Sequence, residues 1–425
     1  MVDYFDILLN SKNPQEKQWG ILLCRWEYEN LFNALQICLE KQENIHIFFC
    51  LHQYFAVTKD VSNRLKLCES VCQACQTYPE EIKTGIIGGN IANALGNLAI
   101  AYQDTKNYEQ AKQTELKFIE LTQNLQGVDE QKKAYSLGSG YHNLGMVAQQ
   151  LREWEQARHY YQQALKIYIE YGDRFSQARP LHNLGAVAQE LREWELARSY
   201  YQQSLEIKIE YGDRFSQAST LHQLGKVAAE LGKLEQARSY YQQSLEIKIE
   251  YGDRFYQAMT LHNLGAVAQE LREWEQARSY YQQAIQIYIE YGAAGGTQSA
   301  RYEQAVTLYQ LGNLAQALRE WEQARSYYQQ AIQIFIEYGD RISQAGTLHN
   351  LGNVAKAVGE LREGKSYYLQ ALQIWAEFND GYMIQTYSLP SLVALYQQTQ
   401  DEDIFVAAAD ILGVGVEEVR GLLEG

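Results

Sequence analysis

The chain has 425 residues, of which 46% are hydrophobic and 21% charged, and its formal net charge at pH 7 is −15. This acidic balance argues against a nucleic-acid backbone as the main partner, because phosphate binding needs clustered Lys and Arg side chains. No apolar run is long enough to cross a bilayer, and the first residues lack the basic start and small-residue cleavage site of a signal peptide. We therefore expect a cytoplasmic protein that binds neither nucleic acid nor membrane.

The first part of the chain, residues 1–90, is predicted to be helical, with a possible degenerate repeat between His46 and Ala74. It holds all six cysteines, namely Cys24, Cys38, Cys50, Cys68, Cys72 and Cys75. The last three follow the spacing i, i+4, i+7, so on a helix they share one face. A zinc site is conceivable, but this spacing matches no common ligand pattern. Burial of these thiols as small apolar side chains is favoured.

A repeat occupies the centre of the chain. The stretch LHNLGAVAQELREWE at residues 181–195 returns unchanged at residues 261–275, and close relatives begin at residues 141, 221, 308 and 348. The glycines of the six copies are Gly145, Gly185, Gly225, Gly265, Gly312 and Gly352, with steps of 40, 40, 40, 47 and 40 residues. Such a period is typical of stacked helical pairs or propeller blades. Strand signals are absent, which leaves the helical pairs.

Each copy carries two apolar stripes at helical spacing, so each is predicted to be a helical hairpin. In the second copy the stripes are Leu181, Leu184, Ala188 and Leu191, then Trp194, Ala197, Tyr201 and Leu205. The sequence Glu-Tyr-Gly-Asp at residues 170–173, 210–213 and 250–253 separates the hairpins. Glycine suits the left-handed residue that ends a helix, and aspartate suits the cap of the next helix.

Two features interrupt this pattern. Pro180 falls inside a predicted first helix, seven residues after the Asp173 cap, where we expect a local kink or a later start of the helix. The step of 47 residues comes from an insertion at residues 293–299. We expect this insertion to form a connecting loop and a passive linker, with a hinge or a contact loop as the alternatives.

The recurring spacing resembles the tetratricopeptide repeat signature, in which Leu-Gly is followed by Ala and then Tyr. It reads Leu184-Gly185, Ala197 and Tyr201, and again Leu264-Gly265, Ala277 and Tyr281. The period of 40 is similar to the long-helix arrays of kinesin light chains and of Pins-type polarity scaffolds, whereas HEAT and armadillo repeats lack this spacing. The resemblance implies an all-α fold: a right-handed superhelical solenoid of stacked antiparallel helix pairs, with six repeats over residues 131–380.

The flanks follow the pattern less closely. Residues 91–130 are predicted to form a degenerate repeat, based on Leu98, Ala99, Tyr102 and Ala111. Residues 381–425 are predicted to form capping helices, one of which starts near Pro390. Near the start, residues 27–35 resemble the Glu-x-Glu-Asn-Leu-x-x-Ala-Leu helix of STAND-class signalling ATPases. There the helix follows the ATPase and winged-helix modules and leads into a superhelical sensor, whereas no ATPase module precedes it here.

Two patterns suggest chemistry that we do not expect. Residues 359–366 fit the P-loop pattern G-x4-G-K-S, but that loop needs a preceding strand, and alignment places Gly364 and Lys365 inside a second helix. The recurring histidines do not converge on one ion, because packed helices stand ~8–10 Å apart and zinc needs nitrogens at ~2.0–2.1 Å. No nucleophile and base recur together, so we expect a non-enzymatic protein without metal or cofactor.

In tetratricopeptide arrays the first helix of each pair lines the concave groove, so the resemblance assigns a peptide-binding site to polar residues of these helices. The assigned residues are His142, Asn143, His182, Asn183, His222, Gln223, Lys226, His262, Asn263, Gln310, Asn313, His349, Asn350 and Asn353. Family members that clasp extended peptides use asparagines at this position and just after the glycine. The basic clamp for a C-terminal carboxylate is mostly missing, because Lys226 and Lys356 are isolated. Alternatively, the His and Asn side chains only complete local hydrogen bonding.

Each repeat also holds a tyrosine pair, such as Tyr200-Tyr201, whose second member is predicted to be core. Taken together, these patterns predict a non-catalytic protein–protein interaction scaffold that holds a peptide or protein segment in the groove. A partner of basic or amphipathic character suits the acidic surface. The alternative is the ligand-sensing array of a STAND-type signalling system, in which ligand binding is relayed to an ATPase outside this chain.

Overall fold

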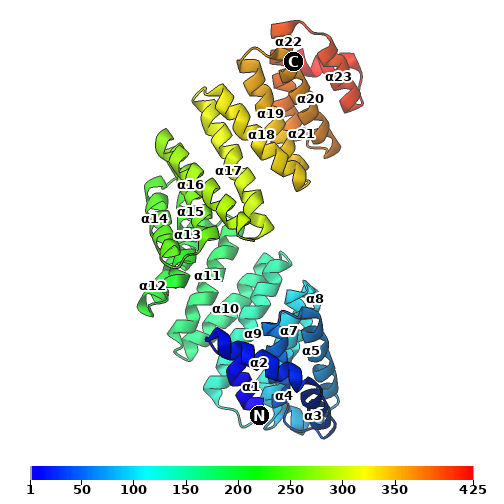
Figure 1. The fold of residues 1–425 in the computed structure, drawn as a ribbon, viewed down its shortest axis with the longest axis vertical. Coiled ribbons are helices and arrows are strands. Elements are labelled where there is room, and N and C mark those ends of the chain that lie inside the picture. Colours follow the sequence, from blue (N-terminus) through cyan, green and yellow to red (C-terminus); the bar gives the residue numbers. More distant parts are fainter. Residues whose placement is uncertain (1, 425) are drawn as a thin grey trace. The chain divides into compact units, whose positions relative to one another are not determined.

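The computed structural model describes residues 2–424, and side chains up to Gly421. Within these residues the structure is helical and contains no β-strand. The chain divides into two compact units, residues 1–213 and 214–425, and the division falls in the turn between two helix pairs. Figure 1 shows the succession of helices along the chain.

The first unit holds twelve helices. They are α1 (Val2–Leu9), α2 (Pro14–Trp26), α3 (Tyr28–Glu40), α4 (His46–Val57), α5 (Val61–Gln76), α6 (Glu80–Thr84), α7 (Gly88–Asp104), α8 (Tyr108–Asn124), α9 (Glu130–Gln150), α10 (Trp154–Glu170), α11 (Arg174–Glu190) and α12 (Trp194–Glu210). From α7 onwards, each odd-numbered helix packs against the even-numbered helix that follows it, as the hairpin prediction requires.

The N-terminal helices enclose the cysteines. Cys68, Cys72 and Cys75 of α5 are at most 3% exposed, which confirms their predicted burial as apolar side chains. Burial raises the pKa of the Cys68 and Cys75 thiols to about 12 and about 11, so both stay protonated at neutral pH. Cys24 and Cys50 bring their sulfur atoms to 3.9 Å of each other in the same core.

The second unit continues the pairs. Its helices are α13 (Arg214–Glu230), α14 (Leu234–Glu250), α15 (Arg254–Glu270), α16 (Trp274–Ala293), α17 (Gln298–Ala317), α18 (Trp321–Glu337), α19 (Arg341–Ala357), α20 (Leu361–Glu377), α21 (Gly381–Met383), the π-helical turn η1 (Ile384–Ser388), α22 (Leu389–Thr399), α23 (Asp403–Leu412) and α24 (Val416–Glu424). Pro390 lies in the first turn of α22, as predicted, and this capping segment packs on α20.

Each pair is held together by a glycine and a tyrosine. A Cβ atom at Gly185 would lie 2.8 Å from the ring of Tyr201, so only glycine lets α11 approach α12 this closely. The second tyrosine of every pair is at most 2% exposed, which confirms the core assignment; these residues are Tyr161, Tyr201, Tyr241, Tyr281, Tyr328 and Tyr368. The turns also agree with the prediction: Gly172 has a φ of 68°, and the Asp173 side chain accepts a hydrogen bond from the Ser176 amide.

The later helix start that was one of the two alternatives at Pro180 was wrong, and so was the loop expected of the insertion. Helix α11 begins at Arg174 and continues through Pro180, which is buried, so the helix does not start later. Packing of α11 against α12 and α10 outweighs the loss of one hydrogen bond. The insertion at residues 293–299 does not form a seven-residue loop either. Helix α16 extends to Ala293 and α17 starts at Gln298, so both helices are lengthened and only a short turn remains.

The P-loop-like stretch has no phosphate-binding geometry. Helix α19 precedes it, Gly359 forms the turn with a φ of 86°, and Gly364 and Lys365 lie inside α20 as predicted. The Lys365 ammonium instead pairs with the Asp401 carboxylate at 2.8 Å. Its charge therefore holds the capping segment on the last repeat.

Candidate functional site

One stripe of every first helix stays uncovered by the second helices. On α13 this stripe consists of Phe215, Ser219 and Lys226, which are exposed, and Gln223, which is half-buried. Leu221 and Leu224, which lie between these positions in the sequence, are at most 4% exposed. We call the surface made by these positions the first-helix face; α9 and α11 carry it in the first unit, and α13, α15, α17 and α19 carry it in the second.

The predicted histidines lie beneath this face rather than on it. His142, His222 and His349 are at most 8% exposed, and His182 and His262 are half-buried. Each imidazole packs on the core tyrosine of its own pair, with ring centroids 5.2–5.5 Å apart. Burial lowers the pKa of these imidazoles to about 3 or 4, so they are neutral at physiological pH.

The hydrogen bonds around His222 define its tautomer. The Thr260 hydroxyl donates its proton to the Tyr256 carbonyl at 2.8 Å, so its oxygen accepts from His222 Nδ1 at 3.2 Å. The other ring nitrogen, Nε2, then accepts from the Asn263 amide at 3.2 Å. Both nitrogens of His222 are therefore used inside the array.

The hydrogen bonds of the equivalent histidines differ between neighbouring repeats. His262 Nδ1 lies 2.9 Å from the Thr307 hydroxyl, whereas His142 Nδ1 is buried without a partner because Pro180 stands where the later repeats have threonine. The Asn183 amide lies 3.5 Å from His142 Nε2. At the end of the array His349 Nδ1 also has no partner among the described residues.

The predicted amides of α17 and α19 have partners inside the array as well. Asn313 accepts from the Tyr328 hydroxyl at 2.8 Å and from Asn350 at 3.1 Å, and it donates to Gln310 at 3.1 Å. Asn353 accepts from the Tyr368 hydroxyl at 2.8 Å. The two asparagines that follow a glycine are thus tied to the core tyrosines.

Asn143 contacts a feature that the sequence analysis did not single out. Its amide donates to the Glu115 carboxyl at 3.2 Å, and Glu115 occupies the place that the later repeats give to the core tyrosine. Burial raises the pKa of Glu115 to about 8, so the carboxyl is largely protonated at neutral pH.

The second unit contains a cavity of about 390 Å³ on the first-helix face, between α13 and α15. Three of the predicted residues, His222, Gln223 and Lys226, line it. The other lining residues are Phe215, Ala218 and Ser219 of α13, Ile247 and Lys248 of α14, Asp253 of the turn, and Tyr256 and Met259 of α15. We call it the Lys248 cavity, because this lysine enters it from the second helix.

Lys248 is 5% exposed. Its ammonium donates to the Thr260 hydroxyl at 2.8 Å and lies 5.5 Å from the centre of the Tyr256 ring. Burial lowers the pKa of Lys248 to about 8, and the charge of Asp253 only partly opposes this effect. The lysine is therefore mostly protonated at neutral pH although its surroundings disfavour the charge.

Sequence reasoning missed Lys248, although a signal was present. The equivalent position holds an aromatic residue in four other repeats, namely Tyr168, Tyr288, Phe335 and Trp375. A lysine inside an apolar stripe marks a buried charge, and buried charges cluster at functional sites.

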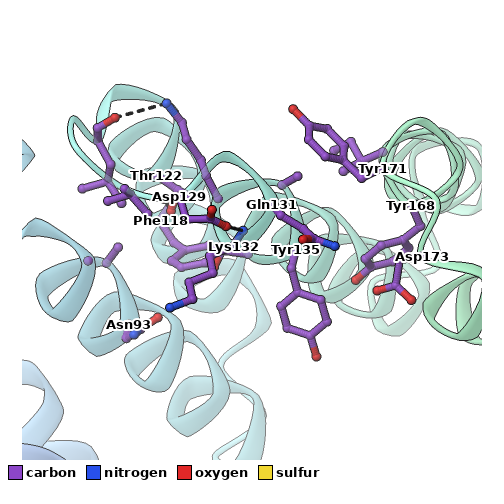
Figure 2. A pocket seen from close by; sticks show the side chains of 18 residues that line it. Asn93, Phe118, Thr122, Asp129, Gln131, Lys132, Tyr135, Tyr168, Tyr171 and Asp173 are labelled. Atoms are coloured by element: carbon purple, nitrogen blue, oxygen red, sulfur yellow. Dashed lines mark hydrogen bonds between the residues drawn. The ribbon is translucent and has the colours of Figure 1, made fainter.

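A second cavity, of about 580 Å³, lies in the first unit at the start of α9. Figure 2 shows the Lys132 side chain of α9 extending towards Asn93 of α7. Tyr135 of α9 lies on the side of Tyr168, with ring centroids 6.3 Å apart. The Asp129 side chain caps α9 by accepting from the Lys132 amide at 2.9 Å. None of the predicted groove residues lines this cavity.

Residues 2–424 contain neither a metal-binding cluster nor a membrane-spanning helix. No group of three His, Cys, Asp or Glu side chains is placed to hold a metal ion. None of the described helices has the length and apolar character needed to span a membrane.

Solved structures with similar folds have low sequence identity to this chain. One is a STAND protein with a tetratricopeptide repeat sensor, PH0952 from Pyrococcus horikoshii. The match covers 89% of this chain and 52% of the STAND protein's chain, with 15% sequence identity and a TM-score of 0.62. Another is the apo form of the quorum sensor NprR from B. thuringiensis. The match covers 88% of this chain and 97% of the NprR chain, with 15% sequence identity and a TM-score of 0.56. A match to a putative kinesin light chain from Podospora anserina covers 46% of this chain and 93% of the kinesin light chain, with 16% sequence identity and a TM-score of 0.40.

No curated protein matches the sequence. Family comparison identifies tetratricopeptide repeats at residues 92–125, 136–210, 216–290 and 303–377, which together span more than half of the chain. These ranges cover most of every helix pair from α7/α8 to α19/α20, and the fold is an all-α solenoid of such pairs. The chain therefore belongs to the tetratricopeptide repeat family.

Proposed function

We propose that this chain is a non-catalytic binding module that holds a peptide or protein segment on its first-helix face, which corresponds to the concave groove assigned from the sequence. The observation that carries this proposal is the Lys248 cavity. It opens on that face and combines apolar walls with polar groups that have hydrogen-bonding capacity left, which is typical of ligand sites.

The composition of the face supports a peptide rather than a nucleic acid or a membrane. Exposed aromatic side chains recur at the start of the first helices, with Phe175 52% and Phe215 56% exposed. Amides lie farther along the same stripe, and the Gln223 carbonyl oxygen is buried without a partner among the described residues. Apolar contacts beside amide groups suit an extended chain, whose backbone offers donors and acceptors next to its side chains.

A non-catalytic role is supported by the state of the histidines. A general base must be able to take up a proton near the working pH. The imidazoles at the recurring position of the first helices are neutral, and His222 uses both of its ring nitrogens for contacts within the array. The matched families are repeat families rather than enzyme families.

The alternative function is the sensor array of a STAND-type signalling system. The similarity of fold to a STAND protein with a tetratricopeptide repeat sensor, over 89% of this chain, favours it. The motif at residues 27–35, which begins at the N-cap residue Glu27 and continues into α3, adds a second observation. In that system, a ligand on the first-helix face would change the contact with an ATPase.

Photo-crosslinking tests the binding face. Short peptides are selected against the wild-type protein from a phage-displayed random library. The photoreactive residue p-benzoylphenylalanine is then placed at Ser219 on the first-helix face or, as the matched control, at Gln243 on the exposed side of α14. We expect the selected peptides to crosslink from position 219 and not from position 243. Crosslinking from 243 alone, or a library that yields no binder, overturns the proposed function.

Nucleotide dependence separates the two functions. The sensor hypothesis predicts that a STAND-type ATPase co-purifies with this chain from native lysate and that its retention differs between ATP and ADP. Equal retention with both nucleotides, or no such ATPase, contradicts the sensor hypothesis and leaves the peptide-binding module.

A further inference from the structure

We propose that two copies of this chain associate through the hairpin of α1 and α2, which forms an antiparallel four-helix bundle with the same hairpin of the second copy. The hairpin is drawn in dark blue in Figure 1. It carries an exposed apolar surface, which we call the hairpin patch and which consists of Tyr4, Ile7, Trp19, Leu22 and Trp26. This surface is separate from the first-helix face, so it is independent of the proposed function.

The hairpin patch follows from the way the two helices pack. The connection between α1 and α2 has four residues, so the helices run antiparallel. They approach closely at Gly20, where a Cβ atom would lie 2.9 Å from the backbone nitrogen of Leu9. Phe5 and Leu9 of α1 and Cys24 of α2 point into the buried core of the first unit. The patch lies on the sides of both helices that turn away from this core.

The exposed area of the patch matches one side of a stable interface. Tyr4 is 59%, Ile7 68%, Trp19 62%, Leu22 49% and Trp26 84% exposed. Aromatic side chains bury about 150–250 Å² each, so the three aromatic residues alone offer about 300–500 Å². A stable interface covers about 800 Å² on each partner, of which roughly 60% is apolar. With Ile7 and Leu22 added, the hairpin patch supplies that apolar share.

The spacing of the patch is self-complementary, which favours a second copy as the occupant. On α2, Trp19 and Trp26 lie at nearly equal distances on either side of Leu22. When two α2 helices pack antiparallel with their Leu22 residues opposite each other, Trp19 of one copy meets Trp26 of the other. Two antiparallel α1 helices likewise bring Tyr4 of one copy against Ile7 of the other. Such mutual contacts are what an interface with two-fold symmetry requires.

Both helix pairings can share one two-fold axis. Gly20 of α2 is level with the Leu8–Leu9 peptide bond of α1. Because the helices are antiparallel and both rise about 1.5 Å per residue, the midpoint of the two tryptophans is level with Asp6. The midpoint between Tyr4 and Ile7 lies within about one residue of this level, roughly 1 Å along the helix. A single axis therefore centres both pairings.

The charge of the hairpin also favours a second copy. The net charge of −15 makes two copies of the chain repel each other. Residues 2–26 are an exception, because their three acidic side chains are balanced by three basic ones, namely Asp3, Asp6 and Glu16 against Lys12, Lys17 and Arg25. Two copies can therefore meet at the hairpin without net repulsion. A lipid surface fits less well, since interfacial helices use an excess of Lys and Arg to bind anionic lipids.

Sedimentation velocity of the full chain tests the association. Between about 1 μM and about 100 μM, we expect the mass to rise from one chain to two. Trp26→Ser should raise the dissociation constant about tenfold or more, because a few aromatic side chains carry most of the binding energy of an interface. The matched control is Tyr382→Ser, which removes a side chain that is 69% exposed in the second unit and should leave the dissociation constant unchanged. Both residues are exposed, and circular dichroism checks that both variants remain folded.

Crosslinking tests the antiparallel arrangement. A short bismaleimide should join Leu22→Cys of one copy to Leu22→Cys of the other, because this residue lies close to the two-fold axis. The control is Ile209→Cys on α12, whose side chain is similarly exposed. This control should give no more crosslinked dimer than the wild type, in which five of the six cysteines are buried and Cys38 is half-buried.

Three results would overturn the proposal: a single chain at every concentration, a dimer that Trp26→Ser leaves equally stable, or a Leu22→Cys variant that crosslinks no better than Ile209→Cys. Flotation with vesicles of phosphatidylcholine and phosphatidylserine covers the lipid alternative. A wild-type protein that floats with these vesicles and stays monomeric without them would assign the hairpin patch to a lipid surface instead. Peptide crosslinking at Ser219 tests the proposed function separately.

Discussion

Replacing Lys248 by methionine should stabilise the protein. Methionine has a similar length and no charge, so it retains the apolar packing of the lysine stem and removes the buried ammonium. Burial lowers the pKa of Lys248 from 10.5 to about 8. Near pH 7 this difference corresponds to about 3 kcal/mol against the charged form in the fold. The hydrogen bond to Thr260 is lost, so we expect the free energy of unfolding to rise by roughly 1–3 kcal/mol.

The pH dependence of this gain follows from the direction of the pKa change. The folded-state pKa of Lys248 lies below its unfolded value, so the unfolded state binds more protons between the two. The cost of the charge is fully present below about pH 8 and disappears as the pH rises towards 10.5. The gain from Lys248→Met should therefore be constant below pH 8 and vanish near pH 10.5. The groups around Lys248 that carry or can carry charge, His222, Lys226, Asp253 and Tyr256, are the same in both proteins.

Chemical denaturation followed by far-ultraviolet circular dichroism measures this effect at several pH values. Lys226→Met serves as the control, because Lys226 is exposed and its removal relieves no burial. A variant that is less stable than wild type near pH 7 would refute the reasoning. A gain that persists unchanged to high pH would assign the stabilisation to packing and not to the charge.

Two further predictions test other parts of the structure. On α19, Gly352→Ala should lower the free energy of unfolding by about 1–3 kcal/mol, because a Cβ atom there would lie 2.5 Å from the Tyr368 ring. The control is Gly346→Ala on the same helix, whose Cβ atom would meet only the Tyr309 hydroxyl at 3.9 Å. This control should be neutral or stabilising in the same denaturation assay. Pro180→Thr should raise the free energy of unfolding by about 2 kcal/mol. The change restores a helical N–H and gives the buried His142 Nδ1 a hydroxyl partner. An unchanged denaturation midpoint would show that α11 has relaxed around the proline.

The helical hairpins were predictable because their causes are local and repeated. The small residues and the tyrosine that close each pair, such as Gly185 and Tyr201, recur at one spacing, and the packing they predict is observed. The Asp173 cap and the Gly172 turn are likewise set by the residues themselves. The later helix start at Pro180 and the loop expected at residues 293–299 were wrong, because packing against neighbouring helices extended helical structure through positions where local preference opposes it.

The sequence by itself determined the repeat, its helical pairs and the family to which the chain belongs, since these depend on periodic apolar positions that each repeat carries alone. Only the tertiary structure decided what the polar residues do. His222 turned out to be bonded to Thr260 and Asn263, which come from the following repeat, and Lys248 to face a cavity built from α13, α14 and α15. The physical reason is that the environment of a buried polar group is set by segments that are distant in the chain. Its protonation state and the number of its unpaired hydrogen-bond donors are fixed only when those segments are in place.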